Sequence, residues 1–344
     1  MTLTMTISDS INNDLFSVNL DKVLDSSFAA IDWQAPWLCH LSQLDYLSKT
    51  IKQLSEQNEP QSRSKSSGHS HNRIDLIAKV LNEALNQLGA YKQTCEQNSL
   101  PKTQPITDHQ AHVLKFVSQN ALPETQGYEQ FIAMTGNIPT RDNLHDLFNG
   151  SIWLTFPKTK AILNYHHMLE IAKRRDEQDN SPSRGRVRDT ITVFDENGAV
   201  LVTSQPSIGE ALIDFDWQNS LINPRAHFDN PLSPKPDAQA AVYIFGHALL
   251  EQLIEPRKPL CAHSVVIHVR ENFFRLSTAE RIHYLDNTLA EYMDKLLSQH
   301  EVTPRQLAPL PILGVPHFWS ENSDPSFYDD AYVFRSGRHR QKPH

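Results

Sequence analysis

Hydrophobic and polar positions between Pro139 and His167 predict two consecutive helices, each with an apolar face and a polar face. At about 100° per residue, the apolar side of the first helix has the spacing of a core-facing helix. Its other side carries an unusual set of side chains: Asp142, His145, Asp146, Asn149 and Trp153. A plain solvated face would carry Glu, Lys or Gln instead. Trp153 therefore indicates that this polar face is itself partly covered, and covered polar groups need hydrogen-bond partners.

The second helix is predicted to begin at Pro157, a residue suited to the first helical position. Lys160, Asn164 and His167 then share one face at i, i+4, i+7 spacing, and His166 points elsewhere. Because a short connection makes the two helices neighbours, we expect their polar faces to converge. Two interpretations stay open, a functional pocket and a structural hydrogen-bond network. The candidate catalytic residues on the two helices are His145, Asp146, Asn149, Lys160, Asn164 and His167.

In residues 187–203 the spacing of apolar residues changes from the helical period of the preceding segment to an alternation typical of a strand. Val187, Asp189, Ile191 and Val193 alternate with polar residues, and the sequence Asp-Glu-Asn-Gly that follows is typical of a turn. We therefore expect a β-hairpin near 187–203, with Asp195 and Asn197 as turn residues. Asp189 lies among the apolar alternates and is expected to point inward, where a carboxylate needs an Arg, His or metal partner. It is the seventh candidate catalytic residue.

Further along, residues 241–245 form a short apolar run that ends in Gly246-His247. One interpretation is a buried strand that leads into a helix over 248–254, which places His247 at a junction where small-molecule sites often lie. The other is a single helix over 237–254 with a packed histidine. A long amphipathic helix is expected over 277–299. The predicted fold class is α+β: a predominantly helical single domain with a small sheet.

Composition narrows the function classes. The chain has 344 residues and a hydrophobic content of 39%. Its net charge of −8 argues against nucleic-acid binding, which needs a basic surface. Three scattered cysteines fit a reducing cytosol, and neither a signal peptide nor a membrane span is expected. We expect a cytoplasmic protein. The expected divisions are a polar leader (1–27), a helical N-terminal part (28–121) with a flexible insert (56–73), a main core (122–334) and a basic tail (335–344).

Four blocks carry a resemblance to a known family: RDNLHDLFNGSIWLTFPKTKAILNYHH, RGRVRDTITVFDENGA, FGHALLEQLIEPRKPLCAH and LPILGVP. Together they resemble the proteobacterial domain of unknown function DUF3025, from about Leu122 to Phe334. The chain departs from the usual family pattern after Pro316, where His317-Phe318-Trp319 replaces Gly-Trp. The resemblance implies a bacterial, cytosolic protein and assigns no catalytic residue.

Three functional hypotheses follow. The first is a hydrolase acting on a small anionic ligand, with or without a divalent metal, because imidazole and carboxylate groups can hold an ion that activates water. Lys160 and Arg188 would hold the anion, and the candidate metal ligands are His145, His167, His247 and Asp189. The second is a non-enzymatic binding or scaffold protein in which the same residues form a buried network. The third and weakest is nucleic-acid contact through the RGRVR stretch and the basic tail.

Overall fold

The computed structural model describes residue 24 and residues 26–56, 75–96, 113–176, 185–299 and 301–337. The expected leader up to residue 23, the insert from residue 57 and the tail from residue 338 lie outside the described residues, so the proposed division of the chain stays a prediction. Within the described residues the helices are α1 (Asp45–Glu56), α2 (Leu76–Glu96), α3 (Tyr128–Thr135), α4 (Leu144–Thr155), α5 (Pro157–Asp176), α6 (Arg186–Asn197), α7 (Pro206–Ile213), α8 (His247–Gln252) and α9 (Thr278–Leu297). The strands are β1 (Lys115–Ser118), β2 (Asn137–Thr140), β3 (Gly198–Thr203), β4 (Ala240–Ile244), β5 (Cys261–His268) and β6 (Ala308–Pro311).

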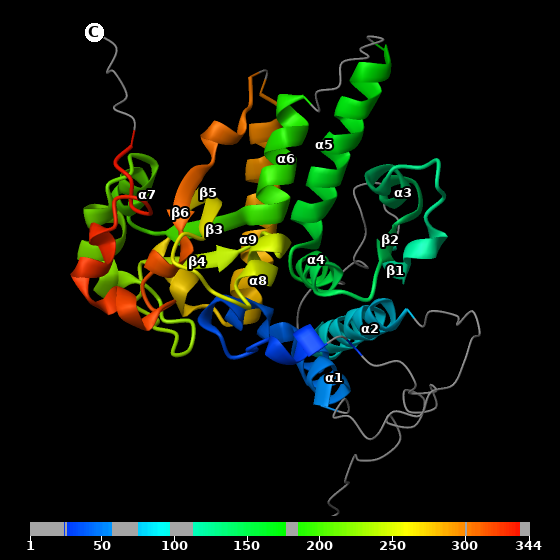
Figure 1. Ribbon diagram of the computed structural model, residues 1–344, viewed down its shortest axis with the longest axis horizontal. Helices are drawn as coiled ribbons and strands as arrows, with labels where there is room; N and C mark the ends of the chain where they lie inside the picture. Colours follow the sequence, from blue (N-terminus) through cyan, green and yellow to red (C-terminus); the bar gives the residue numbers. More distant parts are fainter. Residues whose placement is uncertain are drawn as a thin grey trace, which may run out of the picture.

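A four-stranded sheet of order β4-β3-β5-β6 lies at the centre of the fold. Its inner strand β3 runs antiparallel to β4 and parallel to β5, and every residue of β3 is buried. Figure 1 shows α5, α6 and α9 on one side of this sheet, with α7 and the C-terminal segment on the other. A second sheet pairs β1 with β2 in parallel. The expectation of a mostly helical α+β fold is confirmed.

The expected β-hairpin near 187–203 is wrong. Arg186–Asn197 is helix α6, and only Gly198–Thr203 is a strand. Thr190, Ile191 and Phe194 are the buried residues of α6, at helical spacing, and the Phe194 ring stacks on Phe245 with centroids 4.8 Å apart. A short run of apolar residues can fit both the two-residue period of a strand and the 3.6-residue period of a helix. Here the segment is helical, and Phe194 packs into the core on that helix. Asp189 consequently lies exposed on α6 and does not point inward.

The first central helix begins later than the sequence indicates. Pro139 and Thr140 belong to β2, and α4 starts at Leu144 with Asn143 as its N-cap. The Asn143 side chain accepts a hydrogen bond of 2.8 Å from the backbone N–H of Asp146, which satisfies one free donor of the first turn. Helix α5 does begin at Pro157, as expected. Trp153 is only 2% exposed, so the polar face of α4 is covered.

Gly246 joins strand β4 to helix α8 and is pressed against the start of β3. Its N–H donates to the Gly198 carbonyl at 2.8 Å, as does the N–H of Phe245 at 2.9 Å. This junction confirms the strand-then-helix interpretation of residues 241–254. A methyl group on Gly246 would lie 2.4 Å from the Gly198 nitrogen and 2.5 Å from the Glu196 carbonyl oxygen. Backbone atoms surround the site, so only glycine fits there.

We expect Gly246→Ala to lower the free energy of unfolding by about 1–3 kcal/mol, because overpacking against backbone cannot be relieved by a side-chain rotation. Urea denaturation followed by circular dichroism measures it. Gly89→Ala is the matched control: it lies in helix α2 with nothing within 4 Å of the added carbon, so it should be neutral or stabilising. Equal stability of Gly246→Ala and the native chain would contradict the packing described.

Candidate functional site

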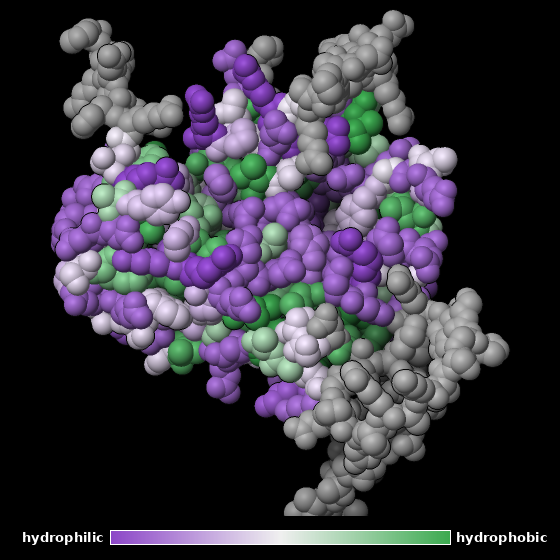
Figure 2. All heavy atoms as spheres, in the orientation of Figure 1, coloured by the Kyte–Doolittle hydropathy of each residue, from purple (hydrophilic) through white to green (hydrophobic). Residues whose placement is uncertain are grey.

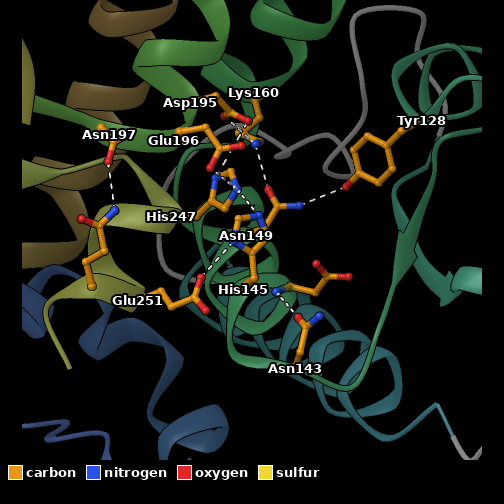
Figure 3. A network of polar contacts seen from close by, with 12 residues as sticks. Tyr128, Asn143, His145, Asn149, Lys160, Asp195, Glu196, Asn197, His247 and Glu251 are labelled. Atoms are coloured by element: carbon orange, nitrogen blue, oxygen red, sulfur yellow. Dashed lines mark hydrogen bonds and ion pairs between the residues drawn. The ribbon is translucent and has the colours of Figure 1, made fainter. Parts of the chain in front are cut away.

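Two histidines from distant parts of the sequence meet where α4 and α8 pack together. The Nε2 atoms of His145 and His247 lie 3.0 Å apart, and the two rings are nearly perpendicular, at 76°. His145 sits in the first turn of α4, and His247 is the first residue of α8. Figure 3 shows both rings facing the same point between the helices. The structure therefore brings together His145 and His247, two of the four candidate metal ligands.

Glu196, from the last turn of α6, completes a cluster of three. Its Oε2 lies 3.5 Å from His247 Nε2, and one ligand atom from each of His145, Glu196 and His247 lies within 4.8 Å of the other two. His247 is buried, whereas the side chains of His145 and Glu196 are 32% and 35% exposed. The cluster is thus held by a buried residue and is open to solvent on one side.

A carboxylate is hydrogen-bonded to the far nitrogen of one of the two imidazoles, that of His145. His145 Nδ1 lies 2.9 Å from Glu251 Oε2, an arrangement that favours a proton on Nδ1 and a lone pair on Nε2. Glu251 lies on α8 four residues after His247, so one helix supplies both groups. The nearest carboxylate oxygen to His247 Nδ1 is Asp195 Oδ2, at 3.9 Å, which is beyond hydrogen-bonding distance. Carboxylate–histidine pairs of this kind orient metal-binding imidazoles in proteins.

Lys160 is a buried cation that holds the neighbouring carboxylate in place. Its Nζ donates to Asp195 Oδ1 at 2.6 Å and to Asn149 Oδ1 at 2.9 Å, and it lies 5.3 Å from the centre of the Trp153 ring. Asn149 in turn donates to the Tyr128 hydroxyl at 3.0 Å. The polar faces of α4 and α5 therefore do converge, through Asn149 and Lys160. Figure 3 shows this chain of contacts running from Tyr128 to Asp195.

The charge state of these groups follows from burial and from Lys160. Burial lowers the pKa of His247 to about 4, against the opposing effect of Asp195, so its imidazole is neutral at pH 7. Burial also raises the pKa of Glu196, and the Asp195 carboxylate adds to that effect. For Asp195 itself burial acts to raise the pKa, but the charge and the hydrogen bond of Lys160 outweigh it, and the pKa is lowered. A neutral imidazole beside carboxylates is the form that binds a metal ion.

The other candidate residues lie outside the histidine cluster. Asp146 pairs with Arg141, at 2.8 Å between Oδ1 and Nη2, and Asn164 donates to the Glu129 carbonyl at 2.9 Å. The Nδ1 of His167 accepts a hydrogen bond of 3.4 Å from Arg188 Nε. His167 and Asp189 are therefore not part of the described metal-type cluster. Helix geometry explains this for His167, which lies seven residues, about two turns, beyond Lys160 along α5.

Sequence reasoning missed Asp195, Glu196 and Glu251. The turn assigned to 195–198 hid the first two, because a helical α6 was not expected. The sequence could have indicated Glu251. In a helix that begins at His247, Glu251 lies four residues later, on the same face as His247. No local pattern pointed to Glu196, because its partners are 51 residues away or more along the chain.

These features define the class of protein. It is an α+β chain with a central four-stranded mixed sheet and a partly exposed His-His-Glu cluster where α4, α6 and α8 meet. Residues 114–338 match the family described as "Protein of unknown function (DUF3025)". The match covers more than half of the chain, and the chain belongs to this family. No curated protein and no solved structure matches it. Across the described residues, no helix is long and apolar enough to span a membrane.

Proposed function

We propose that this protein binds one divalent transition-metal ion through His145, His247 and Glu196 and uses it to hydrolyse a small anionic substrate. The observation that carries the proposal is the meeting of three atoms of metal-ligating type, two imidazole nitrogens and a carboxylate oxygen, within 4.8 Å of one another. Glu251 favours a lone pair on His145 Nε2, which faces His247 Nε2 at 3.0 Å and has the Glu196 carboxylate beside it. With both Nε2 atoms unprotonated, their lone pairs and the carboxylate repel one another, and a cation between them removes that repulsion.

The distances support an ion. With metal–ligand bonds of about 2.1 Å and bond angles of about 90–109°, two ligand nitrogens are about 3.0–3.4 Å apart. The separation of 3.0 Å between the two Nε2 atoms lies at the short end of that range, and the 3.5 Å between His247 Nε2 and Glu196 Oε2 lies just above it. Two imidazoles and a carboxylate suit zinc and its neighbours. Three protein ligands leave a further position for water, as in catalytic rather than structural sites.

Hydrolysis is the chemistry that such an ion would supply. Held by His145, His247 and Glu196, such an ion would lower the pKa of a bound water toward neutral pH and so supply a nucleophile. Lys160, which was expected to hold an anion, is already used by Asp195 and Asn149. Arg188, the other residue expected to hold the anion, donates from Nε to His167 Nδ1, which lies outside the cluster. A cytoplasmic location and the absence of nucleic-acid binding stay predictions.

A structural network is the second candidate, and one observation favours it. A separation of 3.0 Å between His145 and His247 also suits a direct N–H···N hydrogen bond, with the proton on one Nε2. The cluster would then fix α4 against α8 without an ion. This is the scaffold interpretation of the same residues.

Metal analysis separates the two. The full chain, purified without a tag, is expected to carry about one zinc, manganese or iron per molecule and, after chelation, to bind Zn²⁺ at one site by calorimetry. The loaded protein should hydrolyse p-nitrophenyl phosphate or p-nitrophenyl acetate faster than the chelated protein. Failure to bind any of these ions would leave only the structural network. Metal binding without hydrolysis of any ester would remove the hydrolase and keep the metal site.

A further inference from the structure

The second ring nitrogen of His247 is a buried atom without a partner. His247 is 4% exposed, and its Nδ1 makes no hydrogen bond among the described residues. Figure 2 shows hydrophilic residues across the middle of this face of the molecule, where the end of α6 lies beside α8, but Nδ1 itself lies beneath the surface. Buried polar atoms are nearly always satisfied in folded proteins. We therefore expect a group packed around the ring to become the partner of this nitrogen.

Metal binding decides which nitrogen of His247 carries the proton. A neutral imidazole has one N–H group and one lone pair. Binding of an ion through Nε2, the atom 3.0 Å from His145 Nε2, uses the lone pair of that nitrogen. The proton then lies on Nδ1, where a buried N–H group needs an acceptor. The metal site is therefore complete only if an acceptor stands beside His247 Nδ1.

Asp195, in the last turn of α6, offers the closest carboxylate oxygen to this nitrogen. Its Oδ2 lies 3.9 Å from His247 Nδ1, about 1 Å beyond the usual hydrogen-bond length of about 2.9 Å. In Figure 3 the side chains of Asp195 and His247 lie next to each other. Side-chain rotation alone can close a gap of this size. The backbone carbonyl of Asp195 is a second acceptor near the ring.

The other oxygen of Asp195 is fixed by a network from three further helices. Lys160 Nζ, on α5, donates to Oδ1 at 2.6 Å. It also donates to Asn149 on α4, whose amide donates to the hydroxyl group of Tyr128 on α3. Lys160 is 5% exposed, so its pair with Asp195 is shielded from water on the lysine side. The carboxylate is thereby anchored through Oδ1, which leaves Oδ2 for His247.

We propose that Asp195 is the positioning residue of the metal site: its carboxylate accepts a hydrogen bond from His247 Nδ1 when the ion is bound and keeps Nε2 directed at the ion. The inference rests on the proposed metal site and deepens it, because each histidine ligand then has its own carboxylate, Glu251 for His145 and Asp195 for His247. Such an outer partner fixes the orientation of the ring and raises the basicity of the ligating nitrogen. Consecutive residues of α6 then act on the ion in two ways, Glu196 directly and Asp195 through His247.

The zinc affinity of Asp195→Asn tests the proposal, measured by calorimetry on the full chain after metal has been removed with a chelator. The single amide oxygen goes to Lys160, and the amide N–H groups then face the N–H group of His247. We expect zinc to bind about 10–100-fold more weakly than to the native chain, the effect of losing an outer partner. Asp189→Asn is the matched control, the same change at an exposed position of the same helix, and should keep the native affinity.

Two further measurements separate positioning from a purely structural role. Lys160→Met/Asp195→Leu removes both charges at once, so it leaves no unpaired buried ion and should show the same loss of zinc affinity. The Nδ1–H signal of His247 is followed by NMR in the zinc-loaded chain with isotope-labelled histidine. Asp195→Asn should move this signal, whereas Glu251→Gln should move the signal of His145. A structural contact alone would lower stability and leave the signal of His247 in place.

Three results would overturn the role of Asp195. Equal zinc affinity of Asp195→Asn and Asp189→Asn would leave the metal site standing and assign the acceptor to the backbone carbonyl. A loss as complete as that in His247→Ala would make Asp195 a ligand itself and not a positioning residue. If the native chain binds no zinc, the proposed function fails and this inference fails with it.

Discussion

Replacing His247 with alanine should abolish stoichiometric binding of zinc to this protein. His247 is the buried member of the cluster, and its Nε2 is the atom closest to both His145 and Glu196. His145→Ala should have the same consequence. Glu251→Gln keeps the shape of the side chain but removes the charge behind His145. Loss of an outer partner of this kind costs about 10–100-fold in metal affinity, so the loss in His247→Ala and His145→Ala should exceed that range.

The Zn²⁺ affinities of the native chain and of these three variants are measured by calorimetry after bound metal has been removed with a chelator. His268→Ala is the control. His268 lies exposed at the end of β5 and belongs to no described cluster. The expected order of affinity is native and His268→Ala, then Glu251→Gln, then the two ligand variants. An equal affinity of the native chain and His247→Ala would place any bound zinc elsewhere and return the two histidines to a structural role.

The second large effect concerns Lys160, whose replacement by methionine should lower the free energy of unfolding by about 3 kcal/mol or more. The change leaves the Asp195 carboxylate without its counter-ion at a site where Lys160 is 5% exposed and Asp195 25% exposed. Removing one partner of a buried pair typically costs about 3–5 kcal/mol, because the remaining charge stays desolvated. Urea denaturation in the presence of a chelator measures the change apart from any effect of metal.

Two controls sharpen this measurement. Lys173→Met removes a lysine that is also 2.6 Å from its acidic partner, Glu170, but is 63% exposed. Exposed pairs contribute about 0–1 kcal/mol, so this variant should be nearly neutral. Adding Asp195→Asn to Lys160→Met should recover much of the lost stability, because no uncompensated charge remains. Equal losses in Lys160→Met and Lys173→Met would show that the Lys160 pair is no stronger than a surface contact.

Several features of this protein could be predicted from local sequence alone. The two consecutive helices, the helical start at Pro157 and the passage from strand to helix at Gly246 each depend on residues a few positions apart. Apolar periodicity, proline and glycine report such short-range preferences directly. The convergence of Asn149 and Lys160 also followed, because a single-residue link forces α4 and α5 to be neighbours. The family blocks in the sequence were sufficient to identify DUF3025, which the match over residues 114–338 confirms.

The tertiary structure decided the conformation of α6 and the membership of the site. The alternation over 187–193 was compatible with a strand, whereas the structure has a helix whose buried face, Thr190, Ile191 and Phe194, packs on the core, with Phe194 stacked on Phe245. That helix delivers Asp195 to Lys160 and Glu196 to His247. His145 finds its partners 102 and 106 residues away. Pairing over such separations is set by how whole elements pack, and no local pattern in the chain encodes it.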